Sequence, residues 1–348
     1  MTWRDAAYRV ARPLLFRVDA EAIHGATLRA LAIAGRHSPA LCRLASGIDE
    51  ADASRAPAEV MGLRFRNRIG LGAGFDKDGV AIQGWAALGF GFVELGTVTP
   101  RPQPGNASPR LFRLTHDEAL INRMGFNNSG ADALARRITA VRPLLPDGFV
   151  IGVNIGRNVD ASVDDYPAAA TAVASVADYL AINVSSPNTP GLRQLQEPDA
   201  LRRIVDAVGA AAPGIPLVVK LSPDLSDDER TAILDRLTDA PVAGLVVSNT
   251  TVTRPNLRSR RLAQEEGGLS GRPLLRRTLA AVHAVGDRGV SVIASGGIGS
   301  ETDAKAALDA GADLVQLWTG LVYRGPGLIG EAVKSSRMAD DTVLTVTR

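Results

Sequence analysis

The sequence predicts an α/β protein built as a (β/α)8 TIM barrel with a small N-terminal helical extension. Three observations lead to this prediction. Eight short, almost purely apolar runs alternate with helical patterns over about 290 residues, which is the count and length that such a barrel needs. Polar and glycine-rich residues follow the runs, and roughly the first forty residues carry a separate helical pattern. We therefore expect a helical segment at 1–44, a linker at 45–58 and the barrel at 59–348.

The N-terminal segment contains two amphipathic patterns. The first is an apolar stripe at helical spacing, formed by Ala7, Val10, Ala11, Leu14, Leu15 and Val18. The second follows Asp19, an N-cap residue, and we expect Pro39 to close that helix. Residues 1–43 hold seven arginines against Asp5, Asp19 and Glu21, a net charge of +4. Such a basic helical pair either packs on its own domain or lies on a membrane surface, and the residues alone leave both open.

Residues 45–58 are small and polar without periodicity, which predicts a linker. After it, the apolar runs predict parallel strands buried on both faces, at 69–72, 92–95, 150–154, 180–184, 217–221, 244–248, 292–294 and 314–317. Helical patterns lie between them at 166–177, 201–212, 227–237, 274–285 and 302–310. A doubly wound sheet is the alternative, but that fold does not require eight repeats.

Composition excludes several classes of function. The 39 Lys and Arg nearly balance the 37 Asp and Glu, so a nucleic-acid partner is not expected. Cys42 is the single cysteine and the four histidines are far apart, which argues against a disulfide, a redox pair of cysteines and a bound metal. The N-terminus does not resemble a signal peptide, and no apolar run reaches the length of about 18 residues that a spanning helix needs. We expect an intracellular chain whose chemistry comes from ordinary side chains or an organic cofactor.

The active site of a (β/α)8 barrel lies at the C-terminal ends of its strands. The predicted strands run into polar or glycine-rich residues at 73–77, 96–100, 154, 183–189, 220, 248–251, 295–299 and 318–320. A turn explains one such motif, but not all eight together. Glycine pairs at 267–268 and 296–297 let the backbone approach a phosphate closely, which favours a phosphorylated ligand. Neither GxxxxGK[ST] nor a GxGxxG after the first strand occurs, so a Rossmann-type nicotinamide enzyme is disfavoured.

Two lysines and a set of asparagines stand out among these residues. Lys77 and Lys220 lie at strand ends, where a buried lysine needs an anion or an acceptor. An ion pair of Lys77 with Asp76 or Asp78 and a Schiff-base lysine are the two other interpretations. Each asparagine alone fits a turn, but several together would hold a small planar molecule with urea-like or imide edges. They are Asn122, Asn127, Asn128, Asn154, Asn183, Asn188 and Asn249.

Four motifs in order make the chain resemble the dihydroorotate dehydrogenases, specifically their quinone-linked class 2 form. They are the runs at 96–106 (GTVTPRPQPGN), 121–128 (INRMGFNN), 183–191 (NVSSPNTPG) and 267–273 (GGLSGRP). The resemblance extends over nearly the whole chain, from the N-terminal helix pair to Gly325 and Pro326. It implies oxidation of dihydroorotate to orotate, the fourth step of pyrimidine biosynthesis, with one non-covalent FMN per chain.

The resemblance also implies roles for individual residues. Ser186 is the expected catalytic base, with Thr189 and a water chain as the expected proton exit. The residues expected around the substrate are Lys77, Asn122, Arg123, Met124, Gly125, Phe126, Asn183, Asn188, Asn249 and Thr250. Those expected at FMN are Ala73, Gly74, Phe75, Asp76, Lys77, Thr97, Asn154, Asn183, Lys220, Ser248, Gly271, Gly297, Trp318 and Thr319.

Several features match class 2 in particular. The position that holds a catalytic cysteine in class 1 is Ser186 here, and Cys42 lies outside the barrel. The N-terminal helices resemble the module that rests on the bilayer and admits quinone, with His24 and Arg113 as expected tunnel residues. This implies a peripheral protein on the cytoplasmic side of the cell membrane. Trp318 replaces the family's usual tyrosine, a departure that concerns the quinone side. A non-catalytic phosphate sensor and a Schiff-base lyase remain the competing hypotheses.

Overall fold

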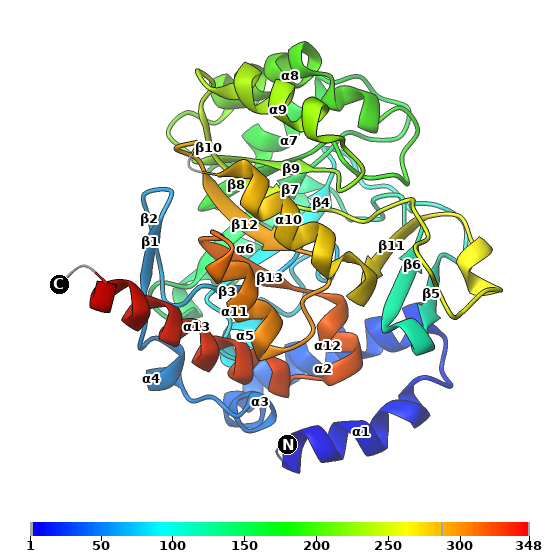
Figure 1. Cartoon of the computed structure of the whole chain (residues 1–348), viewed down its shortest axis with the longest axis vertical. Coiled ribbons are helices and arrows are strands. Elements are labelled where there is room, and N and C mark those ends of the chain that lie inside the picture. The colour runs from blue at the N-terminus through cyan, green and yellow to red at the C-terminus, as the bar shows by residue number, and fades with distance from the viewer. Residues whose placement is uncertain (1–2, 287, 347–348) are drawn as a thin grey trace.

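The computed structural model describes residues 3–286 and 288–346, and eight parallel strands close into a barrel within them (Figure 1). In chain order these strands are β3 (Ile69–Leu71), β4 (Phe92–Val98), β7 (Val150–Ile155), β8 (Tyr179–Asn183), β9 (Leu217–Leu221), β10 (Val242–Val247), β12 (Ser291–Ser295) and β13 (Leu314–Leu317). The predicted barrel and its eight strands are confirmed. Residues 1–2, 287 and 347–348 of the predicted segments lie outside the described residues.

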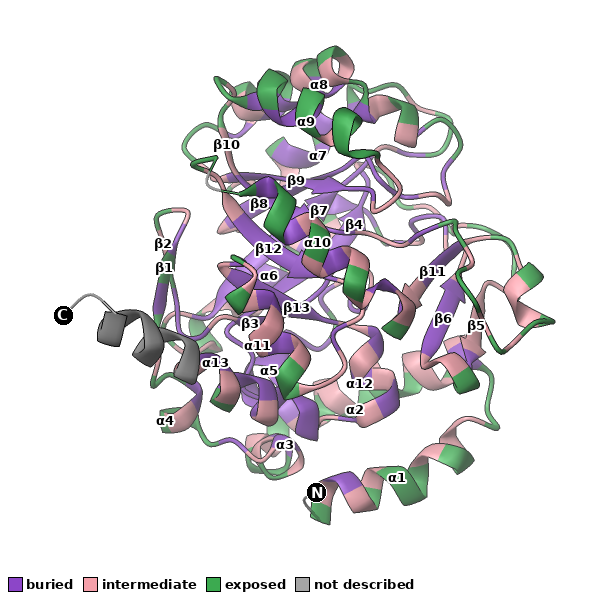
Figure 2. Cartoon of the chain, viewed as in Figure 1, coloured by how far each residue is buried: buried purple, intermediate pink, exposed green. Residues whose placement is uncertain are grey.

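The barrel is filled by alternating large and small residues. A cluster inside its N-terminal end contains Phe92 and Tyr179, and a hairpin of β1 (Ala58–Val60) and β2 (Leu63–Phe65) covers it. A Cβ on Gly152 would lie 2.0 Å from the Tyr179 ring, so that glycine makes room for the aromatic side chain. The outward faces of the strands pack against the helices, and the strands are almost wholly buried (Figure 2). The interior is therefore a packed core, as in other barrels of this type.

The helices surround the barrel in the expected order. They are α5 (Ile82–Ala87), α6 (Ala131–Val141), α7 (Asp165–Val173), α8 (Pro198–Ala211), α9 (Asp227–Leu237), α10 (Leu275–Val285), α11 (Glu301–Asp309), α12 (Thr319–Arg324) and α13 (Gly327–Val346). Short 3-10 turns lie at η1 (Thr115–Asp117), η2 (Arg142–Leu144), η3 (Arg193–Gln196), η4 (Leu262–Gln264) and η5 (Arg272–Leu274). The five predicted helical patterns correspond to α7 through α11. Ser226 and Glu229 form a capping box at the start of α9.

The N-terminal segment forms α1 (Trp3–Leu15), α2 (Ala20–His37), α3 (Pro39–Ser46) and the one-turn α4 (Glu50–Ala53). Asp19 caps α2 as predicted, accepting from the backbone N–H of Glu21 and Ala22. Helix α2 ends at His37, directly before Pro39, as expected. Pro39 then opens α3, which was not predicted, at the first helical position, where a missing N–H costs nothing.

The expected linker at 45–58 is ordered and packed. It contains the end of α3, all of α4 and the start of β1. The side chains of Ile48 and Ala53 are buried in the main hydrophobic core. Glu50 accepts from the buried guanidinium of Arg66 at 2.6 Å. The segment therefore joins the helical extension to the barrel as a packed connection.

A second, antiparallel sheet stands over the C-terminal ends of the barrel strands, and the sequence did not predict it. Its order is β11–β6–β5, from β5 (Leu111–Leu114), β6 (Ala119–Asn122) and β11 (Gly268–Gly271). Two loops of the barrel supply these strands, one between β4 and α6 and one between β10 and α10. The bidentate ion pair of Arg110 with Glu21, whose shortest distance is 2.6 Å, joins this sheet to α2. The sheet therefore connects the helical extension to the mouth of the barrel (Figure 1).

Candidate active site

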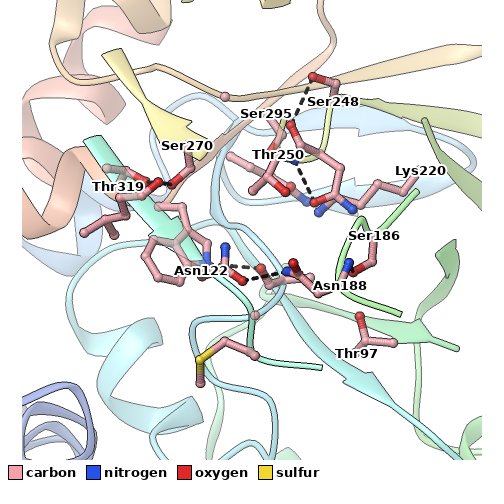
Figure 3. A pocket seen from close by; sticks show the side chains of 18 of the residues that line it. Thr97, Asn122, Ser186, Asn188, Lys220, Ser248, Thr250, Ser270, Ser295 and Thr319 are labelled. Carbon is pink, nitrogen blue, oxygen red and sulfur yellow. Dashed lines mark hydrogen bonds between the residues drawn. The ribbon is translucent and has the colours of Figure 1, made fainter. Parts of the chain in front are cut away.

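One deep cavity opens at the C-terminal end of the barrel, and its empty space is about 1080 Å³ including the open mouth. Residues at or after the C-terminal ends of seven of the eight barrel strands line it, together with the antiparallel sheet and α2. Figure 3 shows how the polar side chains of these loops surround one hollow.

Most of the residues singled out from the sequence line this cavity. They are His24, Ala73, Gly74, Lys77, Thr97, Asn122, Met124, Gly125, Phe126, Asn183, Ser186, Asn188, Lys220, Ser248, Asn249, Thr250, Gly271, Gly297, Trp318 and Thr319. Residues separated by up to 295 positions in the chain thus meet at one place. The clustering is what the barrel predicts, because the C-terminal ends of its strands meet at one mouth.

The floor of the cavity is a buried polar network centred on Glu94. One of its oxygens accepts from the Asn154 amide at 2.8 Å and lies 3.5 Å from the Lys220 ammonium. The other accepts from Gln316 at 2.6 Å and from the Tyr179 hydroxyl at 3.3 Å. Burial first, and then the Glu94 carboxylate, raise the pKa of Tyr179 well above its usual range, so its phenol keeps its proton. Because a buried charge needs a partner, Glu94 and Lys220 stabilise each other here.

Asn154 belongs to this floor and does not line the cavity itself. Its amide oxygen accepts from Thr97 at 2.5 Å and from the Asn183 amide at 3.1 Å, and both of those residues face the cavity. Asn183 in turn accepts from the backbone N–H of Ser185 at 3.3 Å. Hydrogen bonds thus run without a break from Glu94 to the loop that carries Ser186. Such fully bonded networks hold their members in fixed positions.

Three asparagines from separate segments line the cavity above this floor. Asn188 donates to Asn122 Oδ1 at 3.1 Å, so the loop after β8 contacts β6 (Figure 3). Asn249, after β10, donates to Ser185 Oγ at 2.9 Å. The Ser186 hydroxyl is buried and accepts from the Asn188 N–H at 3.3 Å. The arrangement offers neutral donors and acceptors close to one hydroxyl, which suits a flat ligand with amide edges.

Lys77 and His24 stand at the side of the cavity nearest α2. Lys77 donates to the Gly74 carbonyl at 3.0 Å, and neither of the expected ion pairs, with Asp76 or Asp78, is among its contacts in the described part of the chain. Burial first, and then the positive charge of Arg110, lower the pKa of Lys77 to about 8. Burial and Lys77 likewise lower the pKa of His24 to about 4. His24 is therefore neutral at pH 7, and its Nε2 donates to the Phe75 carbonyl at 2.6 Å.

Glycines at the end of β11 and in the loop after β12 line another part of the cavity. Gly271, Gly296 and Gly297 all have positive φ, between 78° and 130°. A Cβ on Gly297 would lie 2.3 Å from the backbone N of Leu275, and one on Gly271 would lie 2.3 Å from the Glu118 carbonyl. Ser270 and Thr319 share a hydrogen bond of 2.9 Å beside them. Glycines leave the backbone N–H groups accessible, and backbone N–H groups together with nearby hydroxyls are the groups that commonly bind a phosphate.

Several further residues singled out from the sequence do not line the cavity, and Asn127, Asn128 and Thr189 are among them. Asp76 accepts from the backbone N–H groups of 80 and 81 and from Trp85, so it shapes the strand-end loop from below. Phe75 packs on Trp318, with ring centres 4.8 Å apart. Arg123 pairs with Glu265 at 2.8 Å. Arg113 donates to the carbonyl groups of 15 and 18 in the turn between α1 and α2.

Other lining residues were not recognised in the sequence. They are Leu111, Leu120, Leu274 and Gln316, whereas Ser270, Ser295, Gly296 and Ile298 lie in the glycine-rich motifs that the sequence had singled out. Glu94 and Gln316 had a usable signal, because a charged or amide residue inside an otherwise apolar barrel strand must find a buried partner. Leu111 and Leu120 had no such signal in the sequence, because the antiparallel sheet is what brings them to the cavity.

Fold and site together place the protein among the (β/α)8-barrel enzymes whose active-site mouth is lined by glycines, lysines and side-chain amides. The family model for dihydroorotate dehydrogenase matches residues 55–335. Two relatives called dihydroorotate dehydrogenase (quinone), from Burkholderia multivorans and Burkholderia pseudomallei, are each 47% identical over 95% of this chain and cover 97% and 98% of their own lengths. The chain belongs to the dihydroorotate dehydrogenase family.

Solved structures agree with this assignment. DHODH from Eimeria tenella in complex with ferulenol superposes with a TM-score of 0.83 at 36% identity, covering 94% of this chain and 93% of that one. The ligand-free form of the same protein gives a TM-score of 0.79 at 37% identity, covering 89% and 95%.

Proposed function

We propose that this chain oxidises dihydroorotate to orotate, the fourth step of pyrimidine biosynthesis, and passes the electrons through a bound FMN to a quinone. The observation that carries the proposal is the cavity. It combines a glycine-lined phosphate cradle, a buried lysine and carboxylate pair, and three amides beside a buried serine. Membership of the family gives the reaction, and the cavity offers groups for each part of it.

The residues present fit one FMN, held without a covalent bond. The Gln316 Oε1 atom is buried at the cavity and accepts no hydrogen bond from the described residues, so a bound group with an N–H donor would satisfy it. Gly271, Gly296 and Gly297 would hold the phosphate, with Ser270 and Thr319 beside them. We assign the ring to the floor formed by Thr97, Asn183 and Lys220. FMN would supply hydride acceptance at this position.

The substrate would lie between the asparagines and the loop after β8. Asn122, Asn188 and Asn249 would bind the amide edges of the dihydroorotate ring, and Lys77 would face its carboxylate. The Ser186 hydroxyl would take the proton from the substrate carbon as the catalytic base. A serine hydroxyl is a weak base, so it needs an onward acceptor for its own proton. Thr189, whose buried Oγ1 has no partner among the described residues, is the proposed first member of that exit.

The quinone would reach the cavity between α2 and the antiparallel sheet. His24 of α2 and Leu111 and Leu120 of the sheet line that side of the cavity. His24 is neutral and its ring lies edge-on to Phe75 at 5.0 Å, so His24 itself places no charge beside an apolar ligand. Arg113 would act indirectly, since it fixes the turn between α1 and α2 and stacks over Phe16 at 4.8 Å.

We further propose that residues 1–44 hold the protein on the surface of a membrane, on the cytoplasmic side of the cell membrane. Helix α1 docks through polar contacts, from Tyr8 to the carbonyl of 322 and from Arg12 to the carbonyl of 323. Its apolar stripe points outward, with Val10 76% and Leu14 62% exposed. Among the described residues no helix is both long and apolar enough to cross a membrane. A basic helix with an exposed apolar face fits binding in the interface plane.

The experiment that tests the proposed chemistry compares the wild-type protein with Ser186→Ala. Purified wild-type protein should be yellow and should bleach when dihydroorotate is added without air. The variant should bind FMN normally but bleach about 10²–10⁴-fold more slowly, which is the usual contribution of a general base. Stopped-flow absorbance measures both rates. Equal rates would show that Ser186 is not the base.

A further inference from the structure

The loops that follow β8, β9 and β10 are joined behind the cavity by one arginine. The loop after β8 carries Ser186, and the loop after β10 carries Asn249 and Thr250. Arg193 opens the 3-10 turn η3 directly behind the first of these loops. It does not line the cavity, so it has no place in the chemistry proposed above.

Arg193 donates in three directions at once. Its Nε donates to the carbonyl of Ser185 at 3.1 Å, next to the proposed base. One terminal nitrogen donates to the carbonyl of Thr250 at 2.8 Å. Thr250 follows Asn249, whose side-chain amide is proposed to bind the substrate. The other terminal nitrogen pairs with Asp224, in the loop after β9, at 2.8 Å. A guanidinium is suited to this arrangement because its donors point outward from one rigid plane.

Asp224 is the fixed point of this cluster. It accepts from the backbone N–H of 252 at 2.9 Å and from the Thr251 hydroxyl, and Arg277 of α10 lies 3.2 Å away. Gln196 of the same turn η3 accepts from the N–H of Ser222 at 2.8 Å. The side chains of Arg193 and Asp224 are 23% and 15% exposed, so water competes little for these bonds. The cluster is therefore a rigid clamp across three neighbouring loops.

We propose that Arg193, anchored by Asp224, is a positioning residue that fixes the Ser186 hydroxyl relative to Asn249 and Thr250. This inference rests on the proposed function, because it assumes that Ser186 takes the substrate proton. Loss of the clamp would let the two loops separate while leaving the residues that contact the ligands unchanged. A misplacement of about 1 Å in a reacting group costs on the order of 10²-fold in rate.

The test uses Arg193→Ala in the full-length, FMN-loaded protein. Anaerobic stopped-flow bleaching by dihydroorotate should slow about 10- to 100-fold. Orotate affinity, measured by titration of the flavin absorbance, should fall by a smaller factor, since the ligand-contacting side chains remain. Added guanidinium should restore part of the rate, and Arg193→Lys should be slow as well because an ammonium lacks the planar fork.

Arg202→Ala is the matched control. Arg202 also makes several bonds, to Asp206 and to the carbonyl groups of 236 and 239, but on the outer helix α8. Its removal should lower stability without slowing bleaching, and guanidinium should have no effect on its rate. If Arg193→Ala does not fold, Asp224→Asn serves as the second variant. It keeps Arg193 but weakens its anchor, and it should also slow bleaching.

The outcomes separate this inference from the proposed function. If the wild-type protein itself does not bleach with dihydroorotate, the proposed function fails and the positioning role fails with it. If the wild type bleaches and the Arg193 and Asp224 variants lose no more rate than Arg202→Ala, only the positioning role is wrong.

Discussion

At the scale of single residues, burial decides the properties of the charged groups at the cavity. Lys77 sits among neighbours of both signs, with Arg110 close by and Asp76, Asp78 and Glu21 around it. Burial is nevertheless the largest influence and lowers the pKa of Lys77 to about 8. The ammonium is charged below that pH and loses its proton as the pH rises through it. A ligand carboxylate therefore meets a cation only on the acid side of about pH 8.

This predicts how orotate binding depends on pH. The dissociation constant of orotate should be nearly constant between pH 6 and pH 7.5 and rise above about pH 8, because only charged Lys77 attracts the carboxylate. Titration of the flavin absorbance at a series of pH values measures it. Lys77→Met should bind weakly and without this rise. An affinity that stays constant in the wild type up to pH 9.5 would rule out Lys77 as the carboxylate partner.

The buried pair of Glu94 and Lys220 leads to a prediction about stability. Glu94→Leu removes the partner of a buried ammonium and leaves Tyr179 and Gln316 without their acceptor. Breaking a buried pair in this way costs about 3–5 kcal/mol of unfolding free energy. Urea unfolding of the FMN-free protein measures the loss. Lys305→Ala, which breaks an exposed pair with Asp309 on α11, should cost no more than about 0.5 kcal/mol and is the control.

A loss of less than about 1 kcal/mol for Glu94→Leu would contradict the assigned role of the pair. The Glu94→Leu, Lys220→Met double variant should recover part of the loss, because no unpaired charge then remains in the core. The two substitutions are therefore expected to be strongly non-additive.

At the scale of elements, α1 is unusual because its apolar stripe is not its packing face. The side chains that dock it are Tyr8, Arg12 and Phe16, and the Phe16 ring lies edge-on to Tyr323 at 5.5 Å. The outward residues continue onto α2 and α3, where Ile33, Leu41 and Leu44 are more than half exposed. Periodicity in the sequence located the stripe, but periodicity cannot tell whether such a stripe faces a core or a membrane.

Membrane binding can be tested with two matched triple variants. Replacement of Val10, Leu14 and Ile33 by Gln should weaken binding to lipid vesicles at least about tenfold, because each large apolar side chain contributes about 1.5–3 kcal/mol when fully buried. Replacement of Val80, Leu144 and Val252, which are exposed elsewhere on the molecule, should leave binding unchanged. Vesicle flotation measures the bound fraction. Equal binding of both variants would show that residues 1–44 are not the membrane contact.

At the scale of the whole molecule, the sequence predicted the repeated parts best. Each barrel strand is a local apolar run, so β8 and β9 were recognisable without knowledge of their neighbours. The antiparallel sheet was not, because β6 pairs with β11 about 150 positions later and neither strand alternates clearly. The polar residues at the mouth were found because the barrel places strand ends together. The clamp of Arg193 and Asp224 depends on distant contacts that no local pattern reveals, whereas Glu94 and Gln316 inside apolar strands did indicate a buried polar partner.

The central claim is that one cavity couples the oxidation of dihydroorotate to the reduction of a quinone. The most direct measurement is an anaerobic reaction of the purified, FMN-loaded protein with dihydroorotate and excess quinone, followed by quantifying orotate and reduced quinone. The account predicts many turnovers, one orotate formed for each quinone reduced, and flavin colour that is lost with dihydroorotate alone and returns when quinone is added. A protein that never bleaches with dihydroorotate, or that bleaches and is not reoxidised by quinone, would contradict it.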